Sequence, residues 1–348
     1  MKKYFPILLC KPGEITALSH LTQNVKDDIV PIIEVIGEGI IESDGSYKSR
    51  LETDLINIWS FDDNKVFLDF SLLGDVDAHI PKIRRLFTNL MRNGVNVVPV
   101  VQFNSSPRYL TLIQNIIATH KCGLCIRENN NSGGFINYNA QVAAMIAQMN
   151  VTENETHLLI DLGFVEAANR NILATLAQLT INSLHNINNW ATIIVSSGSF
   201  PTDLGGLPAP ATNRSNALVH RLPRYEWDVW TVLNALNLPR EIQYSDYGTK
   251  HPYFTPGGYE GSCSIKYTRT HEFLIYRGRK GSEHARGGNQ YNDSASRLIT
   301  SADFYGQPFS WGDDEIFQIG SRADRPGNAG KWVQISQNHH ITVLHSLL

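Results

Sequence analysis

Eight polar side chains occupy corresponding places in the sequence, each at or near the end of a short apolar run. They are Lys11, Glu34, Asp69, Gln102, Arg127, Asp161, Ser197 and Asp246. A charge buried without a partner costs several kcal/mol, so a repeated pattern of this kind needs a purpose. Charge clusters in clefts are typical of functional sites, and we therefore expect these side chains to converge.

The chemistry of the set points first to carboxylate and phosphate chemistry. Four carboxylates, Glu34, Asp69, Asp161 and Asp246, are the candidate catalytic residues. Oxygen ligands of this type suit Mg²⁺ or another hard divalent cation, which would be the cofactor. The candidate ligand-binding residues are Lys11, Gln102, Arg127, Ser197 and, further along the chain, Arg277. A guanidinium can hold a phosphate or carboxylate group by two contacts.

Three interpretations of the carboxylates stay open at this point. Metal-assisted phosphoryl or phosphodiester hydrolysis uses carboxylates around a cation. An acid/base pair acting on a sugar would use two of the same side chains. The structural alternative is a salt-bridge network that closes one end of the fold, with no chemistry at all.

Further clusters have weaker signals. Residues 196–199, Ser-Ser-Gly-Ser, can present backbone N–H groups to an anion, but the pattern favours an ordinary turn. The basic, glycine-rich segment from Arg277 to Arg286 can contact phosphates, but the pattern favours a solvated hairpin tip. His339 and His340 diverge on a helix and make poor joint metal ligands, so at most one would line a site.

The apolar runs that precede the polar residues are typical of strands buried on both faces of a parallel sheet. They lie at residues 3–10, 29–37, 65–71, 96–103, 121–128, 156–163, 191–198 and 241–248. Helical spacing of apolar residues follows most of them, at 14–25, 51–59, 80–91, 109–118, 140–149, 165–184 and 225–236. Eight alternations with short connections predict an α/β fold of the (β/α)8 TIM-barrel type over residues 1–250. An open doubly wound sheet is the alternative, but the first turn lacks its glycine fingerprint.

Residues 251–348 have a different character, rich in Gly, Tyr, His and Arg. We expect a β-hairpin at 262–267 and 272–276, a helix at 291–299, and short strands or loops at 315–320 and 332–336. Asn338 is a plausible helix cap. The segment is predicted to form the last barrel helix or helices plus a C-terminal elaboration near the barrel mouth, packed on the barrel and not clearly independent.

Composition restricts the class of protein. The 348 residues are 42% hydrophobic and 18% charged with a formal net charge of −3, which does not indicate a nucleic-acid partner. No apolar run reaches the roughly 18 residues of a membrane span, and we expect a cytoplasmic protein with no membrane contact. Cys122 and Cys125 spell C-x-x-C, but residues three apart on a strand diverge, which favours ordinary core thiols.

The whole chain resembles the Beta protein family, named after a protein of T-even bacteriophages. The similarity rests on the opening Tyr-Phe-Pro-Ile-Leu with Lys11 and Glu14, on Pro31-Ile-Ile-Glu34, and on Tyr276-Arg-Gly, Gln290-Tyr and Asn338-His-His-Ile-Thr. The resemblance implies a phage or prophage association, hence a role in phage–host conflict as antiviral defence or counter-defence. It implies no reaction.

Two functional hypotheses follow. The first is a hydrolase, metal-assisted, whose rim site acts on or binds a phosphorylated or nucleotide-like ligand. The second is a non-catalytic barrel that serves as a sensor or protein-interaction module, with the residues after 250 as the contact surface for a protein partner. No G-x-S-x-G elbow, Walker loop or H-E-x-x-H motif occurs, which argues against those hydrolase and nucleotide-binding classes.

Overall fold

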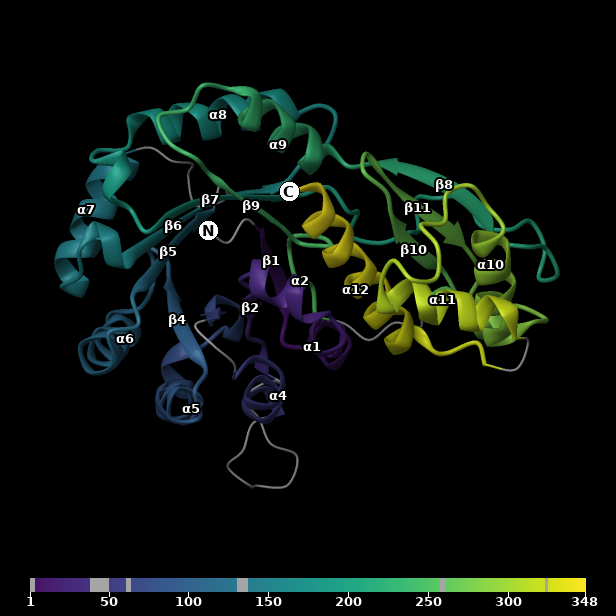
Figure 1. The fold of residues 1–348 in the computed structure, drawn as a ribbon, viewed down its shortest axis with the longest axis horizontal. Coiled ribbons are helices and arrows are strands. Elements are labelled where there is room, and N and C mark those ends of the chain that lie inside the picture. Colours follow the sequence, from purple (N-terminus) through teal and green to yellow (C-terminus); the bar gives the residue numbers. More distant parts are fainter. Residues whose placement is uncertain (1–3, 38–49, 61–63, 130–136, 257–260, 323–324) are drawn as a thin grey trace.

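A closed barrel of eight parallel strands forms the larger part of the molecule (Figure 1). The computed structural model describes residues 4–37, 50–60, 64–129, 137–256, 261–322 and 325–348. The barrel strands are β1 (Tyr4–Leu9), β2 (Ile32–Glu34), β3 (Lys65–Asp69), β4 (Asn96–Val101), β5 (Leu124–Asn129), β6 (Thr156–Phe164), β7 (Thr192–Gly198) and β9 (Gln243–Asp246). They follow one another around the barrel, and β9 closes it by pairing with β1. The predicted TIM-barrel-like fold is confirmed.

Helices on the outside of the barrel cover the strands (Figure 1). They are α1 (Pro12–Ser19), α2 (Gln23–Asp28), α4 (Arg50–Trp59), α5 (Ile80–Arg92), α6 (Pro107–His120), α7 (Tyr138–Met149), α8 (Arg170–Ser183) and α9 (Tyr225–Ala235). Their apolar stripes face inward because buried residues recur every three or four positions, as in α5 at Ile83, Leu86, Phe87 and Leu90. Pro107 opens α6, and the Ser106 hydroxyl caps it by accepting the Tyr109 N–H at 3.1 Å.

The strand period of two decides which side chains enter the barrel. Phe67, Cys125, Leu159 and Ile194 pack together in the interior, whereas Leu68, Ile126 and Ile160 pack outward against the helices. Residues two positions after an interior residue also point inward. This alternation of inward and outward side chains determines the direction of every polar side chain at the strand ends.

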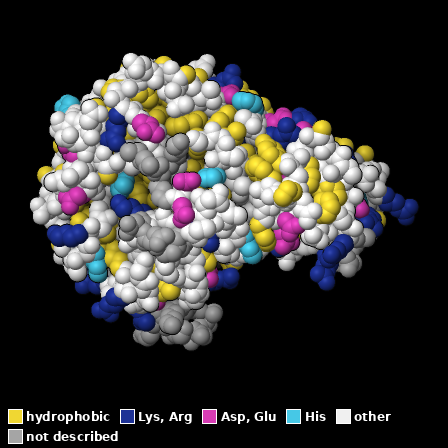
Figure 2. Space-filling view, viewed as in Figure 1, with side chains coloured by type: hydrophobic (Ala, Val, Ile, Leu, Met, Phe, Trp, Pro, Cys, Tyr) yellow, Lys and Arg dark blue, Asp and Glu magenta, His cyan; other side chains and the backbone are white. Residues whose placement is uncertain are grey.

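A second, smaller sheet lies beside the barrel and forms a narrower lobe (Figures 1 and 2). Its strands are antiparallel in the order β10 (Ile265–Thr268), β11 (Glu272–Arg277) and β8 (Leu218–Pro223). One face, with Ile265, Tyr267, Leu274 and Tyr276, packs in a cluster with residues of α10 (Gln290–Ile299), α11 (Trp311–Ser321) and α12 (Ala329–Leu347). The predicted hairpin and the helix at 291–299 are present.

Three expectations for this lobe were wrong. Residues 315–320 and 332–336 belong to helices α11 and α12, because Ile316 and Ile319 have helical and not strand spacing. Asn338 does not cap a helix: it lies inside α12, where its amide bonds the Ala17 carbonyl and the Gly312 N–H. The cap of α12 is Asn328, whose side chain accepts the Lys331 N–H.

Two features join the lobe to the barrel. Strand β8 was not predicted; it comes from the connection between β7 and α9, so a segment before residue 250 completes the lobe's sheet. Helix α12 runs from the lobe's core at Trp332 and Ile335 back to the barrel's core at Ile341 and Leu344. It packs against α1, as expected for a last barrel helix. The division of the chain into domains at residue 250 stays a prediction.

The cysteines fit the expectation of core thiols. Cys125 lies inside the barrel, whereas Cys122 is partly buried against the outer core, so the two thiols diverge. Burial raises the pKa of the Cys122 thiol to about 11, which makes it unreactive near neutral pH. Within the described ranges no helix has the length and apolar character needed to cross a membrane.

Candidate functional site

Arg127 forms the centre of a charged cluster inside the C-terminal end of the barrel. It follows the interior residue Cys125 by two positions on β5, so its side chain points inward. Its Nη1 lies 3.0 Å from Glu34 Oε1 and 2.6 Å from Asp69 Oδ2. Its Nε and Nη2 lie 3.0 and 2.7 Å from Asp161 Oδ2. The structure thus brings together four of the residues that the sequence singled out.

Every carboxylate oxygen in this Arg127 cluster already has a donor. Glu34 Oε2 accepts from Lys250 Nζ at 3.0 Å. Asp69 Oδ1 accepts the Ser71 N–H at 2.8 Å, and Asp161 Oδ1 accepts the Gly163 N–H at 3.0 Å. Gly163 has φ +68°, a left-handed conformation that glycine adopts without strain and that turns its N–H back towards Asp161.

Tyr247 completes the cluster from β9's end. Its hydroxyl donates to Asp161 Oδ2 at 2.6 Å and accepts from Arg127 Nη2 at 2.7 Å. The side chains of Arg127 and its three carboxylate partners are only 2–5% exposed. In formal terms three carboxylates face two cations, Arg127 and Lys250, which leaves one negative charge.

The electrostatics show mutual stabilisation. Burial opposes the charge on Arg127, but Tyr247 and the three carboxylates outweigh it and raise its pKa well above the ordinary value. Burial would raise the pKa of Glu34, yet the Lys250 and Arg127 cations lower it overall. Both groups are therefore held in their charged forms by one another.

A divalent metal does not fit this cluster. A cation needs free carboxylate oxygens, and here a guanidinium already occupies the position between them. Among the described residues no group of three His, Cys, Asp or Glu side chains is arranged to hold a metal ion. The geometry matches the salt-bridge network that the sequence left open as the structural alternative.

Asp246 does not converge with the other carboxylates. It follows the outward-facing Tyr244 by two residues, while the neighbouring Tyr247 points into the barrel. Its Oδ1 accepts from Tyr4 at 2.8 Å, and its Oδ2 bonds Tyr244 at 2.9 Å and His340 Nε2 at 2.9 Å. Burial would raise its pKa, but His340 and the nearby Arg224 lower it overall. We expected Asp246 to share the rim site with the other carboxylates. That expectation was wrong, because side chains alternate along β9 and the side chain of Asp246 points outward.

Asp246 and its partners form a separate buried network between the barrel and α12. Arg224, fully buried, pairs with Glu226 at 2.8 Å and approaches Asp246 Oδ2 to 3.6 Å. His339, adjacent to His340, points elsewhere and bonds Asp313 at 2.8 Å. The two histidines diverge, as the helix geometry predicted.

The remaining predicted residues lie apart from the cluster. Lys11 precedes α1, and its Nζ lies 4.9 Å from the centre of the Phe254 ring. Gln102 follows β4, where its N–H bonds the Ser105 hydroxyl. Ser197 is buried and points outward like Val195, so the inward hydroxyl belongs to Ser196, whose Oγ has no hydrogen-bond partner among the described residues. Arg277 lies in the lobe, on β11.

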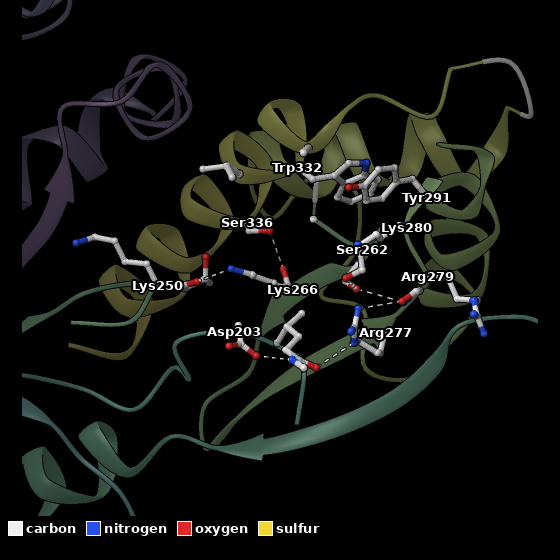
Figure 3. Close-up of a pocket in the computed structure, with 18 of the residues that line it drawn as sticks. Asp203, Lys250, Ser262, Lys266, Arg277, Arg279, Lys280, Tyr291, Trp332 and Ser336 are labelled. Atoms are coloured by element: carbon white, nitrogen blue, oxygen red, sulfur yellow. Dashed lines mark hydrogen bonds between the residues drawn. The ribbon is translucent and has the colours of Figure 1, made fainter. Parts of the chain in front are cut away.

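The cavity that contains Arg277 lies where the lobe meets the barrel rim (Figure 3). Its volume is about 670 Å³. Glu14, Thr249 and Lys250 line it from the barrel side, just after strands β1 and β9. The opposite wall is the lobe's sheet with α10 and α12, which contribute the stacked rings of Tyr291 and Trp332, 5.2 Å apart. This volume and this mixture of apolar and polar walls suit a small molecule.

Two cations in this cavity share one face of the lobe's sheet. Lys266 pairs with Ile275 across the antiparallel ladder, and Arg277 follows Ile275 by two residues. Arg277 Nε and Nη1 donate to the carbonyls of Leu204 and Gly278 at 3.1 and 3.0 Å. Neither Lys266 nor Arg277 lies within 4 Å of a carboxylate in the part of the chain that the structure describes. Neither cation therefore has an ion pair among the described residues, although the Glu14 and Asp203 carboxylates act on Lys266 and Arg277 from beyond 4 Å.

Burial acts on the ionisation of these groups. It lowers the pKa of Lys266 to about 8, although the Glu14 carboxylate nearby favours the charged form. It also lowers the pKa of Arg277. Burial raises the pKa of Glu14, which is partly offset by Lys250 and by the Leu9 N–H that bonds its Oε2 at 2.8 Å. Burial thus disfavours the charged form of each of the three groups.

Sequence reasoning missed Lys266, Lys250 and Glu14 as site residues. Lys266 interrupts the apolar pattern between Ile265 and Tyr267, which is an ordinary alternation for a strand with one polar face. Only the three-dimensional structure, in which β10 pairs with β11, shows that the polar face of this strand is covered. The segment from Arg277 to Arg286 is not a simple hairpin tip, because Arg277 lies within β11 and is partly buried; Lys280 and Arg286 are exposed, and Arg286 pairs with Asp293 at 2.8 Å.

Comparison with known proteins gives a family and a set of distant folds. The model of the Beta protein family matches residues 4–345. Two aspartate-to-asparagine variants of the tryptophan synthase α-subunit from the hyperthermophile Pyrococcus furiosus are similar in structure, each 10% identical in sequence. Each match covers 71% of this chain and 87% of that chain, with TM-scores of 0.41 and 0.40. No curated protein matches this chain.

Proposed function

The chain belongs to the Beta protein family, and we propose that it binds a small phosphorylated or nucleotide-like anion in the cavity between its barrel rim and its lobe. The family resemblance supports a setting in phage–host conflict, as antiviral defence or counter-defence. The one observation that carries the proposal is the pair of cations, Lys266 and Arg277, on one covered face without a carboxylate partner among the described residues.

The balance of charge in the cavity supports this proposal. A cation taken out of water is stabilised by an opposite charge, and the Arg127 cluster shows that this chain pairs its buried cations when pairing is structural. Lys266 and Arg277 have only carbonyl acceptors for their N–H groups. A phosphate group in the cavity would supply the missing negative charge, with Arg277 able to offer its second terminal nitrogen.

The position of the cavity agrees with this role. Glu14, Thr249 and Lys250 lie at the C-terminal ends of barrel strands, the face that carries the site in characterised enzymes of this fold. Arg279 and Lys280 add positive charge to the wall of the lobe. The apolar part of the wall, at Trp332 and Val333, suits the uncharged body of a nucleotide-like molecule.

Hydrolysis by the rim carboxylates is supported less well than binding. Glu34, Asp69 and Asp161 have their oxygens occupied by Arg127, Lys250 and backbone N–H groups, so none is free to activate water or hold a metal. A sensor that binds its ligand with this barrel as a scaffold fits the same observations.

Calorimetry with a matched pair of variants tests the binding. Native protein, Arg277→Met and Arg286→Met are titrated with inorganic pyrophosphate and with a panel of nucleoside mono- and triphosphates. We expect Arg277→Met to weaken binding roughly tenfold or more, since a hydrogen bond to a charged group is lost. Arg286→Met removes an equal charge outside the cavity and should leave the affinity within about twofold. No binding by the native protein, or equal losses in both variants, contradicts the proposal.

The same two variants separate a ligand sensor from a protein-interaction module. In bacteria challenged with phage, a ligand sensor loses its effect with Arg277→Met and keeps it with Arg286→Met. A lobe that acts through its outer surface, bound to a protein partner, gives the reverse result, because Arg286 is exposed and Arg277 is not.

A further inference from the structure

We propose that Lys266 is a nucleophilic amine that forms a Schiff base with a carbonyl group of the anionic ligand. The inference rests on the proposed function, since it assigns chemistry to the same cavity. The ligand class is then a small aldehyde or ketone that carries a phosphate group.

Three lysines line the cavity: Lys250, Lys266 and Lys280. Lys250 is held in its charged form by Glu34 at 3.0 Å, and its nitrogen points away from the other labelled residues of the cavity (Figure 3). Lys280 is half-exposed and lies 3.6 Å from Glu283. Lys266 alone of the three has no carboxylate within 4 Å among the described residues. A lysine must lose its proton to attack a carbonyl carbon, and only Lys266 has no salt bridge to prevent this.

The surroundings of Lys266 hold its amine in place without blocking its lone pair. The Nζ donates to the Thr249 carbonyl at 2.9 Å and lies 4.3 Å from the centre of the Phe200 ring. A neutral amine can donate one N–H to Thr249 and still direct its lone pair at a substrate. Because burial lowers the pKa of Lys266 to about 8, roughly half of it is neutral at pH 8, against less than about 1% for an ordinary lysine.

Glu14 is placed to move the protons that the reaction requires. It lines the same cavity, and its charge acts directly on Lys266. The neutral amine attacks the carbonyl carbon, a C–N bond forms, and a proton passes from the nitrogen to the oxygen to give a carbinolamine. Glu14 then protonates the hydroxyl, which leaves as water as the C=N bond forms, and the Glu14 carboxylate takes a proton back from the nitrogen. Burial raises the pKa of Glu14, which favours the protonated carboxyl that this step needs.

The spacing of the two cations defines the ligand. Arg277 is the diagonal neighbour of Lys266 across the β10–β11 ladder, and residues in that relation lie about 7–8 Å apart. A phosphate held by Arg277 therefore leaves a carbonyl group a few bonds away within reach of Lys266. The cavity of about 670 Å³ has room for a ring or a short chain between the two groups.

Reductive trapping with a phosphorylated aldehyde tests the inference. Native protein, Lys266→Arg and Lys250→Arg are incubated with substoichiometric pyridoxal 5′-phosphate at pH 8, reduced with sodium borohydride and mapped by peptide mass spectrometry. We expect Lys266 to carry most of the label, at least roughly tenfold more than Lys250 or Lys280, and pyrophosphate to suppress the labelling. Lys266→Arg should lose the label at this site, whereas Lys250→Arg should keep it.

The outcomes separate this inference from the function on which it rests. Arg286→Met, whose charge lies outside the cavity, is the control that should keep both the label on Lys266 and pyrophosphate binding within about twofold of native. If the native protein binds pyrophosphate but the label is spread over exposed lysines, the Schiff-base inference is overturned and the binding function stands. If Lys266 is labelled but pyrophosphate neither binds nor protects, the amine is nucleophilic and the anion site is overturned.

Discussion

The Arg127 cluster and the Lys266–Arg277 cavity both remove cations from water, but they do so in opposite ways. In the cluster, one guanidinium has three carboxylates and a tyrosine around it, and each carboxylate oxygen has a donor. In the cavity, two cations share a sheet face with only carbonyl acceptors. The first arrangement is complete by itself, whereas the second becomes complete when an anion enters.

This difference shows that charge at the rim of a barrel is not by itself a sign of chemistry. The Arg127 cluster has the residue types of a catalytic centre, yet its saturation makes it a connection between strands β2, β3, β5 and β6. The cavity has fewer carboxylates and a less conspicuous sequence. Incomplete pairing, more than the number of charges, indicates the binding site.

The largest expected effect is on the stability of the cluster. Asp161→Asn keeps the shape of the side chain but removes the charge that Arg127 contacts through two nitrogens, so we expect a loss of about 3–5 kcal/mol in the free energy of unfolding. Ser196→Ala is the matched control, because Ser196 lies opposite Asp161 in the ladder and has no hydrogen-bond partner among the described residues. It should cost no more than about 1 kcal/mol. Urea unfolding measures both; near-native stability of Asp161→Asn would instead favour an active site.

Stability should rise with pH in both regions, but in separate ranges: the acid range for the cluster and the alkaline range for the cavity. Glu34 has a lowered pKa, so its contribution is present above the ordinary carboxyl value of 4.5 and is lost as pH falls through the folded-state pKa. Lys266 has a folded-state pKa of about 8 against an ordinary 10.5, so the unfolded chain binds more protons between these values and stability rises with pH there.

We expect the alkaline gain from Lys266 to be about 1–2 kcal/mol, because the amine is only partly buried. To measure it, the free energy of unfolding is determined for the native protein and for Lys266→Met between pH 8 and 10.5. The difference between the two proteins removes the contribution of all other titrating groups, and its change with pH is the gain. A flat difference over that range would show that Lys266 is not held in a destabilising environment.

The smallest effect concerns Lys250, which contacts both regions. Lys250→Met removes one donor from Glu34 at a partly exposed position, so we expect about 1 kcal/mol of lost stability. Because the ammonium group points towards Glu34, pyrophosphate affinity should change by less than about threefold. A tenfold loss of affinity would instead assign Lys250 to the anion site and weaken the contrast between the two regions.

The sequence predicted the barrel, and four of the eight polar residues that it assigned to the rim do converge there. Glu34, Asp69, Arg127 and Asp161 were identified because each ends an apolar run whose parity is regular, so all four side chains enter the interior. Asp246 was assigned to the same rim because it also ends a strand. At the end of β9, however, Tyr247 and not Asp246 points into the barrel. The strand sequence Gln-Tyr-Ser-Asp has no alternation of apolar and polar residues, so the direction of its side chains could not be predicted.

The cavity lay beyond sequence reasoning for a different reason. Lys266 and Arg277 converge through an antiparallel register between two short strands, and their face is covered by a loop that follows β7. Glu14 joins them from a helix more than 200 residues away in the chain. Local patterns carry no information on contacts of this range. The same limit explains why β8, which pairs only with the distant β11, was not predicted.

The most direct test of the central claim is the thermal unfolding of Lys266→Met with and without saturating pyrophosphate. If Lys266 is an uncompensated cation that awaits an anion, the variant without ligand melts within about 1 kcal/mol of the native protein or above it. Pyrophosphate at 100 times the native Kd should stabilise the native protein by about 2.7 kcal/mol, and a variant with tenfold weaker affinity by only about 1.4 kcal/mol. A variant that melts as low as Asp161→Asn, or one that pyrophosphate still stabilises fully, would contradict the account.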